Sequence, residues 1–194
     1  LIVRFSSIGD IVLTTPVLRG LKEQLTDIEI HYVTKSKFSS LLENNPRIDK
    51  LWTIEKSIDE IIDALKKENF DQVIDLHHNI RTLALKKKLR KPSASFKKLN
   101  VQKWMLVNLK MKKMPKVHIV DRYMQAVESL GVKKDDSPCE FYISAENEVD
   151  IQQELELNTK KYIGVAIGAQ FATKCLPTDK MVEILKDLDS TIVL

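Results

Sequence analysis

The order in which apolar and polar residues alternate restricts the fold more than any other feature of this chain. Four short runs rich in β-branched residues are separated by longer stretches in which apolar residues recur every three or four positions. A right-handed crossover helix is the usual connection between parallel neighbours, so this alternation indicates a parallel sheet. We therefore expect an α/β fold with helices on both faces of the sheet. The expected strands span residues 1–5, 28–34, 50–54 and 72–76.

The stretches between these runs have the pattern of amphipathic helices. Between Ile58 and Glu68, isoleucine and leucine follow helical spacing and charged residues take the other face, with Ser57 as a suitable N-cap. Further along the chain we expect a helix at 118–130 ended by Gly131, a strand and turn at 138–148, and a short helix at 149–157.

A second α/β unit begins after a polar stretch at residues 156–161. Its expected elements are a strand at 162–167, a helix at 178–188 and a strand at 191–194. We therefore predict an α/β domain at 1–157 and the incomplete beginning of a second α/β domain at 158–194. The chain begins with Leu1 rather than Met, inside an apolar run, so we also expect its natural start to be missing.

Charge is distributed very unevenly. Residues 81–116 contain 13 basic residues and no acidic one, whereas the rest of the chain has 18 basic and 27 acidic residues. This segment predicts two helices, broken near Pro92 and ended by Pro115. No apolar run approaches the roughly 20 residues that cross a bilayer, so we expect a protein that is soluble or bound at a membrane surface.

The two cysteines, Cys139 and Cys175, exclude some classes of protein. They are too few for a disulfide framework, and they lack the paired spacing of a zinc site. A reducing cytoplasm suits this composition best.

The first candidate site is the turn after the first expected strand. Residues 6–10 read Ser-Ser-Ile-Gly-Asp, and ligands of open α/β sheets bind at such turns. Small residues let a ligand approach the backbone, and Asp10 places a carboxylate at the helix start. The alternative is that Asp10 only caps the helix. With a single glycine and no Gly-Lys-Ser/Thr, the turn is neither a dinucleotide fingerprint nor a Walker loop.

The second and third candidate sites also follow expected strands. Residues 75–82 read Asp-Leu-His-His-Asn-Ile-Arg-Thr, but adjacent histidines on an extended segment face opposite ways and form a poor metal pair. At the third site a glycine turn at 164–169 precedes Thr173 and Lys174, a hydroxyl and an amine that suit a phosphate. An ordinary surface lysine is the alternative there.

Together these segments resemble glycosyltransferase family 9, the lipopolysaccharide heptosyltransferases and their relatives. The matching segments are LIVRFSSIGD at 1–10 followed by Thr14, Thr15 and Pro16, VIDL at 73–76, HIVDRY at 118–123, and Gly168-Ala169 followed by Thr173-Lys174 and Leu176-Pro177. The sequence departs from the family at His77-His78, where many members have Gln-Gly, and a glycine- and histidine-containing donor loop is absent.

The resemblance implies the GT-B arrangement of two Rossmann-like domains, the first (1–157) binding the acceptor and the second, begun at 158–194, the nucleotide-sugar donor. It implies that Asp10 is the catalytic base, with its pKa raised by desolvation in a closing cleft and lowered by the helix N-terminus. It also implies that Thr173 and Lys174 hold the donor phosphates. No metal or cofactor is expected, and the donor is ADP-heptose or a similar sugar nucleotide. The acceptor-side candidates are Ser7, Gly9, His77, Asn79, Arg81 and Arg122.

The implied function is transfer of heptose or a similar sugar, with inversion, to a lipopolysaccharide-type glycolipid acceptor. The alternative is a fragment or module that binds anionic glycolipid without catalysis. The basic segment 81–116 would attract the acceptor or the inner face of the inner membrane, where a cytoplasmic, peripheral enzyme would work. A solvated face and a nucleic-acid contact are the other interpretations of this segment, and we expect no nucleic-acid partner.

Overall fold

The computed structural model describes residues 1–111, 115–157, 161–169 and 171–194. Within this part the chain forms two compact units, Leu1–Ser144 and Ala145–Leu194. We describe each unit by itself.

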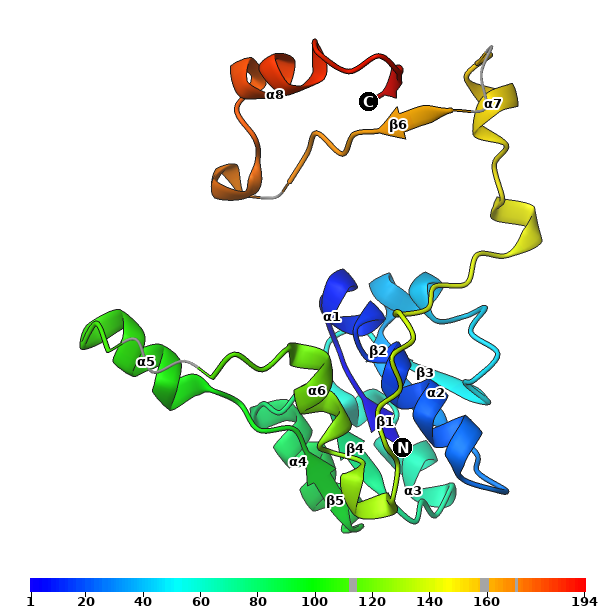
Figure 1. The fold of residues 1–194 in the computed structure, drawn as a ribbon. Helices are drawn as coiled ribbons and strands as arrows, with labels where there is room; N and C mark the ends of the chain where they lie inside the picture. Colours follow the sequence, from blue (N-terminus) through cyan, green and yellow to red (C-terminus); the bar gives the residue numbers. More distant parts are fainter. Residues whose placement is uncertain (112–114, 158–160, 170) are drawn as a thin grey trace. The chain divides into compact units, whose positions relative to one another are not determined.

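The first unit contains a five-stranded sheet in which every pair of neighbours is parallel (Figure 1). The strand order is β3-β2-β1-β4-β5, so the order reverses between β1 and β4, where open α/β sheets bind ligands. The strands are β1 (Ile2–Val3), β2 (His31–Lys35), β3 (Lys50–Ile54), β4 (Val73–Asp75) and β5 (Ser93–Ser95).

Helices of the first unit connect these strands and cover the sheet. The α-helices are α1 (Ile8–Val12), α2 (Thr15–Gln24), α3 (Ile62–Lys67), α4 (Ile80–Leu89), α5 (Asn100–Asn108) and α6 (Ile119–Met124). The 3-10 helices are η1 (Ser36–Leu41), η2 (Ile58–Glu60) and η3 (Glu128–Leu130).

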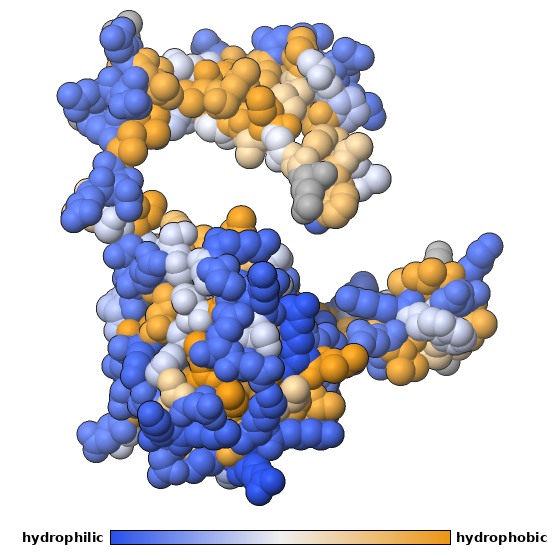
Figure 2. Space-filling view, turned by 180° about the vertical axis from the view of Figure 1, so that it is seen from behind, coloured by the Kyte–Doolittle hydropathy of each residue, from blue (hydrophilic) through white to orange (hydrophobic). Residues whose placement is uncertain are grey.

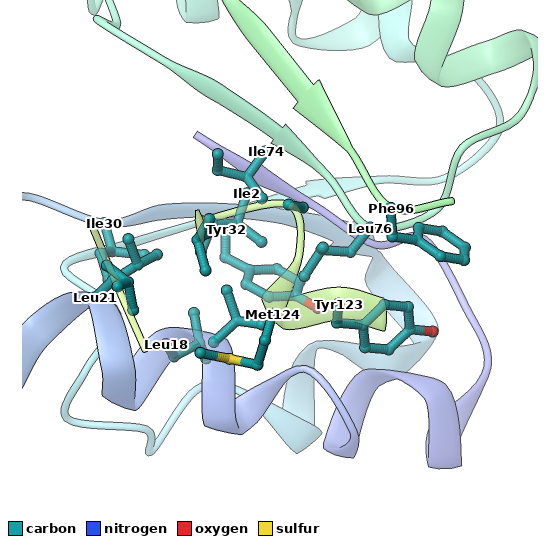
Figure 3. Close-up of a cluster of buried hydrophobic side chains, with 14 of the residues drawn as sticks. Ile2, Leu18, Leu21, Ile30, Tyr32, Ile74, Leu76, Phe96, Tyr123 and Met124 are labelled. Atoms are coloured by element: carbon teal, nitrogen blue, oxygen red, sulfur yellow. The ribbon is translucent and has the colours of Figure 1, made fainter. Parts of the chain in front are cut away.

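Successive strand residues point to opposite faces of the sheet and build two separate cores. Ile2 and Ile74 pack with α2 and α6 in one core, whereas Val3 and Val73 pack with α3 and α4 in the other. Figure 3 shows the first core, where Tyr32 lies among side chains from both helices. Both faces of the sheet are therefore buried, which explains the nearly continuous apolar runs in the strands.

The expected strands at 1–5, 28–34, 50–54 and 72–76 and most expected helices of the first unit are confirmed, with shifted bounds. The sequence 58–68 begins as η2 and continues as α3, and Ser57 caps it by accepting a hydrogen bond from the Asp59 backbone. Gly131 ends the segment after α6 with a φ of 82°, as expected, although α6 itself stops at Met124 and only η3 follows it.

Two expectations for this unit are wrong. The basic segment contains β5 between its two helices, because Ser93–Ser95 pairs with β4 along the edge of the sheet. No strand forms at 138–148: the backbone at 138–140 lies against α2 instead, and a 3-10 helix forms at Ala145–Asn147. Arg19 donates to the Ser137 and Pro138 carbonyl oxygens, and the Glu140 backbone donates to Thr15 Oγ1 at 2.9 Å.

The second unit contains a parallel pair of strands, β6 (Tyr162–Gly164) and β7 (Thr191–Val193), joined through α8 (Thr178–Leu185). This confirms the expected strand, helix and strand. The unit also contains η4 (Ala145–Asn147), α7 (Ile151–Glu154) and η5 (Ala172–Lys174). None of its described residues is buried, and Figure 2 shows hydrophobic side chains over much of its visible surface. A division of function at residue 157 stays a prediction, and residues 158–160 of the expected linker lie outside the described part.

None of the helices in the described ranges is both long enough and apolar enough to span a bilayer.

Candidate active site

Asp10 lies at the edge of the sheet where open α/β folds bind ligands. The chain leaves β1 at Val3 and begins α1 at Ile8, with Ser7 as the N-cap and Asp10 in the first turn. Asp10 Oδ2 accepts hydrogen bonds from Ser7 Oγ at 2.9 Å and from the Ser7 backbone at 3.4 Å. Asp10 thus takes part in helix capping, as the alternative interpretation held, yet its side chain is 38% exposed.

A pocket of about 310 Å³ opens beside this carboxylate. Its walls come from the segments that follow β1, β4 and β5 and from α5 and α6. The charged residues lining it are Asp10 and four cations, Arg4, Lys98, Lys103 and Arg122. A single carboxylate among cations suits a ligand that carries both a hydroxyl group and an anionic group.

The pKa of Asp10 is lowered, contrary to the expected rise. Burial of the carboxylate acts to raise its pKa, but the nearby Arg4 guanidinium and the hydrogen bonds from Ser7 outweigh burial. Arg4 Nη2 lies 2.6 Å from Asp10 Oδ2. Asp10 is therefore ionised, and able to accept a proton, throughout the neutral pH range.

A buried carboxylate shapes the turn after β4. Asp75 is fully buried, and its Oδ1 accepts hydrogen bonds from the backbones of His77 and His78 at 3.1 and 2.6 Å. Its Oδ2 pairs with Lys86 of α4 at 3.0 Å. Asn79 then caps α4 by accepting a hydrogen bond from the Thr82 backbone. These contacts fix the positions from which His77 and Asn79 reach the pocket.

His77 lines the pocket as an uncharged ring. Burial and the nearby cations Arg4 and Lys98 lower its pKa to about 4, so the imidazole is neutral at physiological pH. Its Nδ1 is buried without a hydrogen-bond partner among the described residues. The described residues also hold no group of three or more His, Cys, Asp or Glu side chains that could bind a metal ion.

The structure brings most of the predicted acceptor-side residues together. His77, Asn79 and Arg122 line the same pocket as Asp10, and Ser7 contacts Asp10 directly. Gly9 lies on α1, where an added Cβ would meet nothing within 4 Å. Arg81 is exposed on α4 and is not part of the pocket lining.

Sequence reasoning missed several pocket residues. Arg4, Lys98, Lys103 and Tyr123 line the pocket but are not among the site residues that the sequence predicts. Arg4 carried a usable signal, because it is the only charged residue between Leu1 and Phe5 and it is buried. A buried charge requires a partner, and that requirement points to a site.

The predicted donor-phosphate residues lie in the second unit. Thr173 and Lys174 belong to η5, between β6 and α8, and both are exposed. Lys174 Nζ lies 5.7 Å from the centre of the Phe171 ring. Their position after a strand agrees with the sequence pattern, and their role with a donor stays a prediction.

Comparison with solved structures identifies the class of fold. The chain superposes on a glycosyltransferase family 9 structure from Veillonella parvula with a TM-score of 0.76 at 24% identity, over 98% of this chain and 60% of that one. For E. coli heptosyltransferase WaaC with ADP, the TM-score is 0.64 at 20% identity, over 98% and 64% of the two chains. Nearly all of this chain thus matches the GT-B heptosyltransferase fold, over about 60% of the length of those structures.

Sequence comparison identifies the family. The profile of "Glycosyltransferase family 9 (heptosyltransferase)" matches residues 58–194, and the chain belongs to this family. It is 33% identical to lipopolysaccharide heptosyltransferase 1 of Campylobacter coli over 103 residues, which are 50% of this chain and 30% of that protein. It is 24% identical to lipopolysaccharide heptosyltransferase 3 of Escherichia coli K12 over 93% of this chain and 57% of that protein. The chain therefore spans less than two thirds of these relatives.

Proposed function

We propose that the chain supplies the acceptor-binding domain and the beginning of the donor domain of an inverting glycosyltransferase. The observation that carries this proposal is Asp10, an ionised carboxylate in a pocket whose other charged lining residues are all cations. The enzyme would move heptose or a similar sugar from a nucleotide sugar to a lipopolysaccharide-type glycolipid. Family membership supports the sugar, and the WaaC structure with ADP-2-deoxy-2-fluoro heptose supports the donor.

The proposed reaction uses side chains on both units. Asp10 takes the proton of the acceptor hydroxyl while that oxygen attacks the anomeric carbon from the face opposite the leaving diphosphate. Lys174 and Thr173 stabilise the negative charge that develops on the diphosphate. Inversion follows, because a single displacement from the face opposite the leaving group reverses the configuration at that carbon.

The pocket also indicates the acceptor. Lys98 and Lys103 have no ion-pair partner among the residues that the structure describes, and they lie on the same pocket as Asp10. Unpaired cations around a base favour an acceptor whose reactive hydroxyl lies near a phosphate or carboxylate. The test is release of nucleoside diphosphate from ADP-heptose, by the product of the whole reading frame, with phosphorylated acceptor and with the same acceptor after phosphatase treatment.

A module that binds glycolipid without catalysis is the second candidate function. All residues that line the pocket belong to the first unit, which favours it, because binding of an acceptor there uses no residue of the second unit. Binding of the acceptor with no release of diphosphate in the same assay would support this module and contradict the enzyme.

Replacing Lys174 with Ala is expected to weaken binding of ADP to the protein. Loss of a charge-assisted contact with phosphate corresponds to roughly a tenfold or larger rise in Kd, and higher salt should weaken wild-type binding too. Calorimetry on the product of the whole reading frame measures both effects. Lys180→Ala, an exposed lysine of α8, is the matched control. Equal affinity of wild type and Lys174→Ala would make Lys174 an ordinary surface residue.

The basic segment is expected to bind the protein reversibly to anionic vesicles. Helix α5 exposes Trp104, Val107 and other apolar residues. The segment 81–116 around it contains lysines and arginines but no acidic residue. Each basic residue near an anionic surface contributes about 1 kcal/mol, decaying over a Debye length of about 8 Å. We expect co-sedimentation with anionic vesicles, its loss in high salt, and no binding to neutral vesicles.

Substitution tests which lysines carry this attachment. Lys86 and Lys88 are left intact, because they pair with Asp75 and Asp59. The test variant changes four exposed lysines of the segment to Gln, and the control changes four exposed lysines elsewhere. The first set is Lys87, Lys97, Lys98 and Lys110, and the second is Lys56, Lys67, Lys133 and Lys180. Only the variant that lacks the first set of lysines should lose binding. Similar loss of binding in both variants would mean that net charge alone explains the attachment. Binding to neutral vesicles would indicate insertion of apolar side chains.

A further inference from the structure

The two oxygens of the Asp10 carboxylate have very different surroundings. Oδ2 takes the ion pair with Arg4 Nη2 at 2.6 Å and both hydrogen bonds from Ser7. Oδ1 accepts no hydrogen bond from any residue that the structure describes. Because the carboxylate lines the pocket, Oδ1 is the oxygen left to accept a hydrogen bond from a ligand.

Arg4 is held in place independently of Asp10. Its Nε donates to the Ser6 carbonyl oxygen at 2.6 Å, and its Nη1 donates to the Leu76 carbonyl oxygen at 2.6 Å. Its side chain is only 10% exposed. A planar guanidinium held at two of its three nitrogens has little freedom to turn, so the charge beside Asp10 is fixed by the segments that follow β1 and β4.

We propose that Arg4 is a positioning residue: by fixing Oδ2, it leaves Asp10 Oδ1 facing the pocket as the single atom that accepts the acceptor's proton. This proposal rests on the proposed function and deepens it. In the reaction, the O–H bond of the acceptor breaks and its proton goes to Oδ1. The oxygen's electron pair forms the bond to the anomeric carbon, and the bond to the diphosphate breaks with its electrons leaving on the diphosphate.

The same contact has an opposing effect on the base. Arg4 lowers the pKa of Asp10, and a carboxylate that is less basic accepts a proton less readily. Orientation and basicity thus act in opposite directions. Removing Arg4 should therefore lower turnover near neutral pH and also move the acid side of the pH profile upward, a combination that simple destabilisation does not produce.

The decisive measurement is the titration of the Asp10 carboxyl carbon by NMR, on the full 194-residue chain without substrate. Asp10→Asn assigns the signal. We expect Arg4→Met to raise the titration midpoint of Asp10, and Arg4→Lys to restore it in part. Arg19→Met is the matched control, because Arg19 is also buried and ion-paired but lies outside the pocket lining. It should leave the Asp10 midpoint unchanged.

Kinetics on the product of the whole reading frame complete the test. Arg4→Lys should lower kcat roughly 10- to 100-fold, the equivalent of one hydrogen bond to a charged group, with little change in the KM for the donor. If Arg4→Met does not fold, the titration midpoint of Asp10 in wild type is compared with the midpoints in Arg4→Lys and Ser7→Ala instead. An Asp10 midpoint unmoved in every folded variant would overturn the proposal. The titration needs no turnover, so it tests the role of Arg4 separately from the proposed function. Failure of the proposed function would appear as an Asp10→Asn variant with full activity.

Discussion

Replacing Asp10 with Asn is expected to lower turnover by roughly 10²- to 10⁴-fold, the range typical for loss of a general base. The amide retains the shape of the carboxylate and an oxygen that can accept the hydrogen bonds of Ser7, so the fold and the affinity for ADP should change little. The variant cannot accept the acceptor's proton. Steady-state kinetics with ADP-heptose, combined with calorimetry for ADP, separates the loss of kcat from any change in binding.

The control for this experiment removes a carboxylate away from the pocket. Asp71→Asn changes an exposed acidic residue before β4 and should leave kcat within a few-fold of wild type. Turnover of Asp10→Asn within a few-fold of wild type would exclude Asp10 from the mechanism and return it to a helix-capping role.

Replacing Asp75 with Ala is expected to lower the free energy of unfolding by about 3 kcal/mol, because it leaves a largely buried Lys86 and two backbone N–H groups without their partner. Asp75→Asn should cost less, since its amide oxygen can still accept the two backbone hydrogen bonds. Urea denaturation of the full chain, followed by circular dichroism, measures the change.

An exposed ion pair provides the comparison for Asp75. Asp63 pairs with Lys66 on the surface of α3, and its side chain is 85% exposed, so Asp63→Ala should cost less than about 1 kcal/mol. Equal destabilisation by Asp75→Ala and Asp63→Ala would show that the turn after β4 does not depend on the buried carboxylate.

The fold was predictable where the sequence repeats a local pattern. In β4, Val73 packs in one buried core and Ile74 in the other, so both are apolar. The sequence therefore shows this strand as an apolar run. The edge strand β5 was missed because Ser93, Ala94 and Ser95 carry no such pattern and owe their extended form to pairing with β4. Its dependence on a distant partner explains why no local rule finds it.

The site was predictable in position but not in its electrostatics. The sequence predicted Asp10 at the start of the helix that follows the first strand, and the structure has it in the first turn of α1, at the edge where the carboxyl ends of the parallel strands meet. The lowered pKa of Asp10 depends on the direction of the Arg4 side chain, which is set by a hydrogen bond to Leu76, 72 positions away in the sequence. Contacts of this kind follow from the tertiary structure and leave no trace in spacing or composition.

The described residues that line the pocket stand after strand ends or on α1, α5 and α6, and few of them belong to the buried cores. Mutations in the segment after β5, which contributes Lys98 and Lys103, can therefore accumulate without disturbing the sheet. On the proposed function, the residues that contact the acceptor can thus change while Arg4, Ser7 and Asp10 stay the same. Exchange of residues 97–103 between family members is accordingly a graft expected to change acceptor preference without changing the sheet.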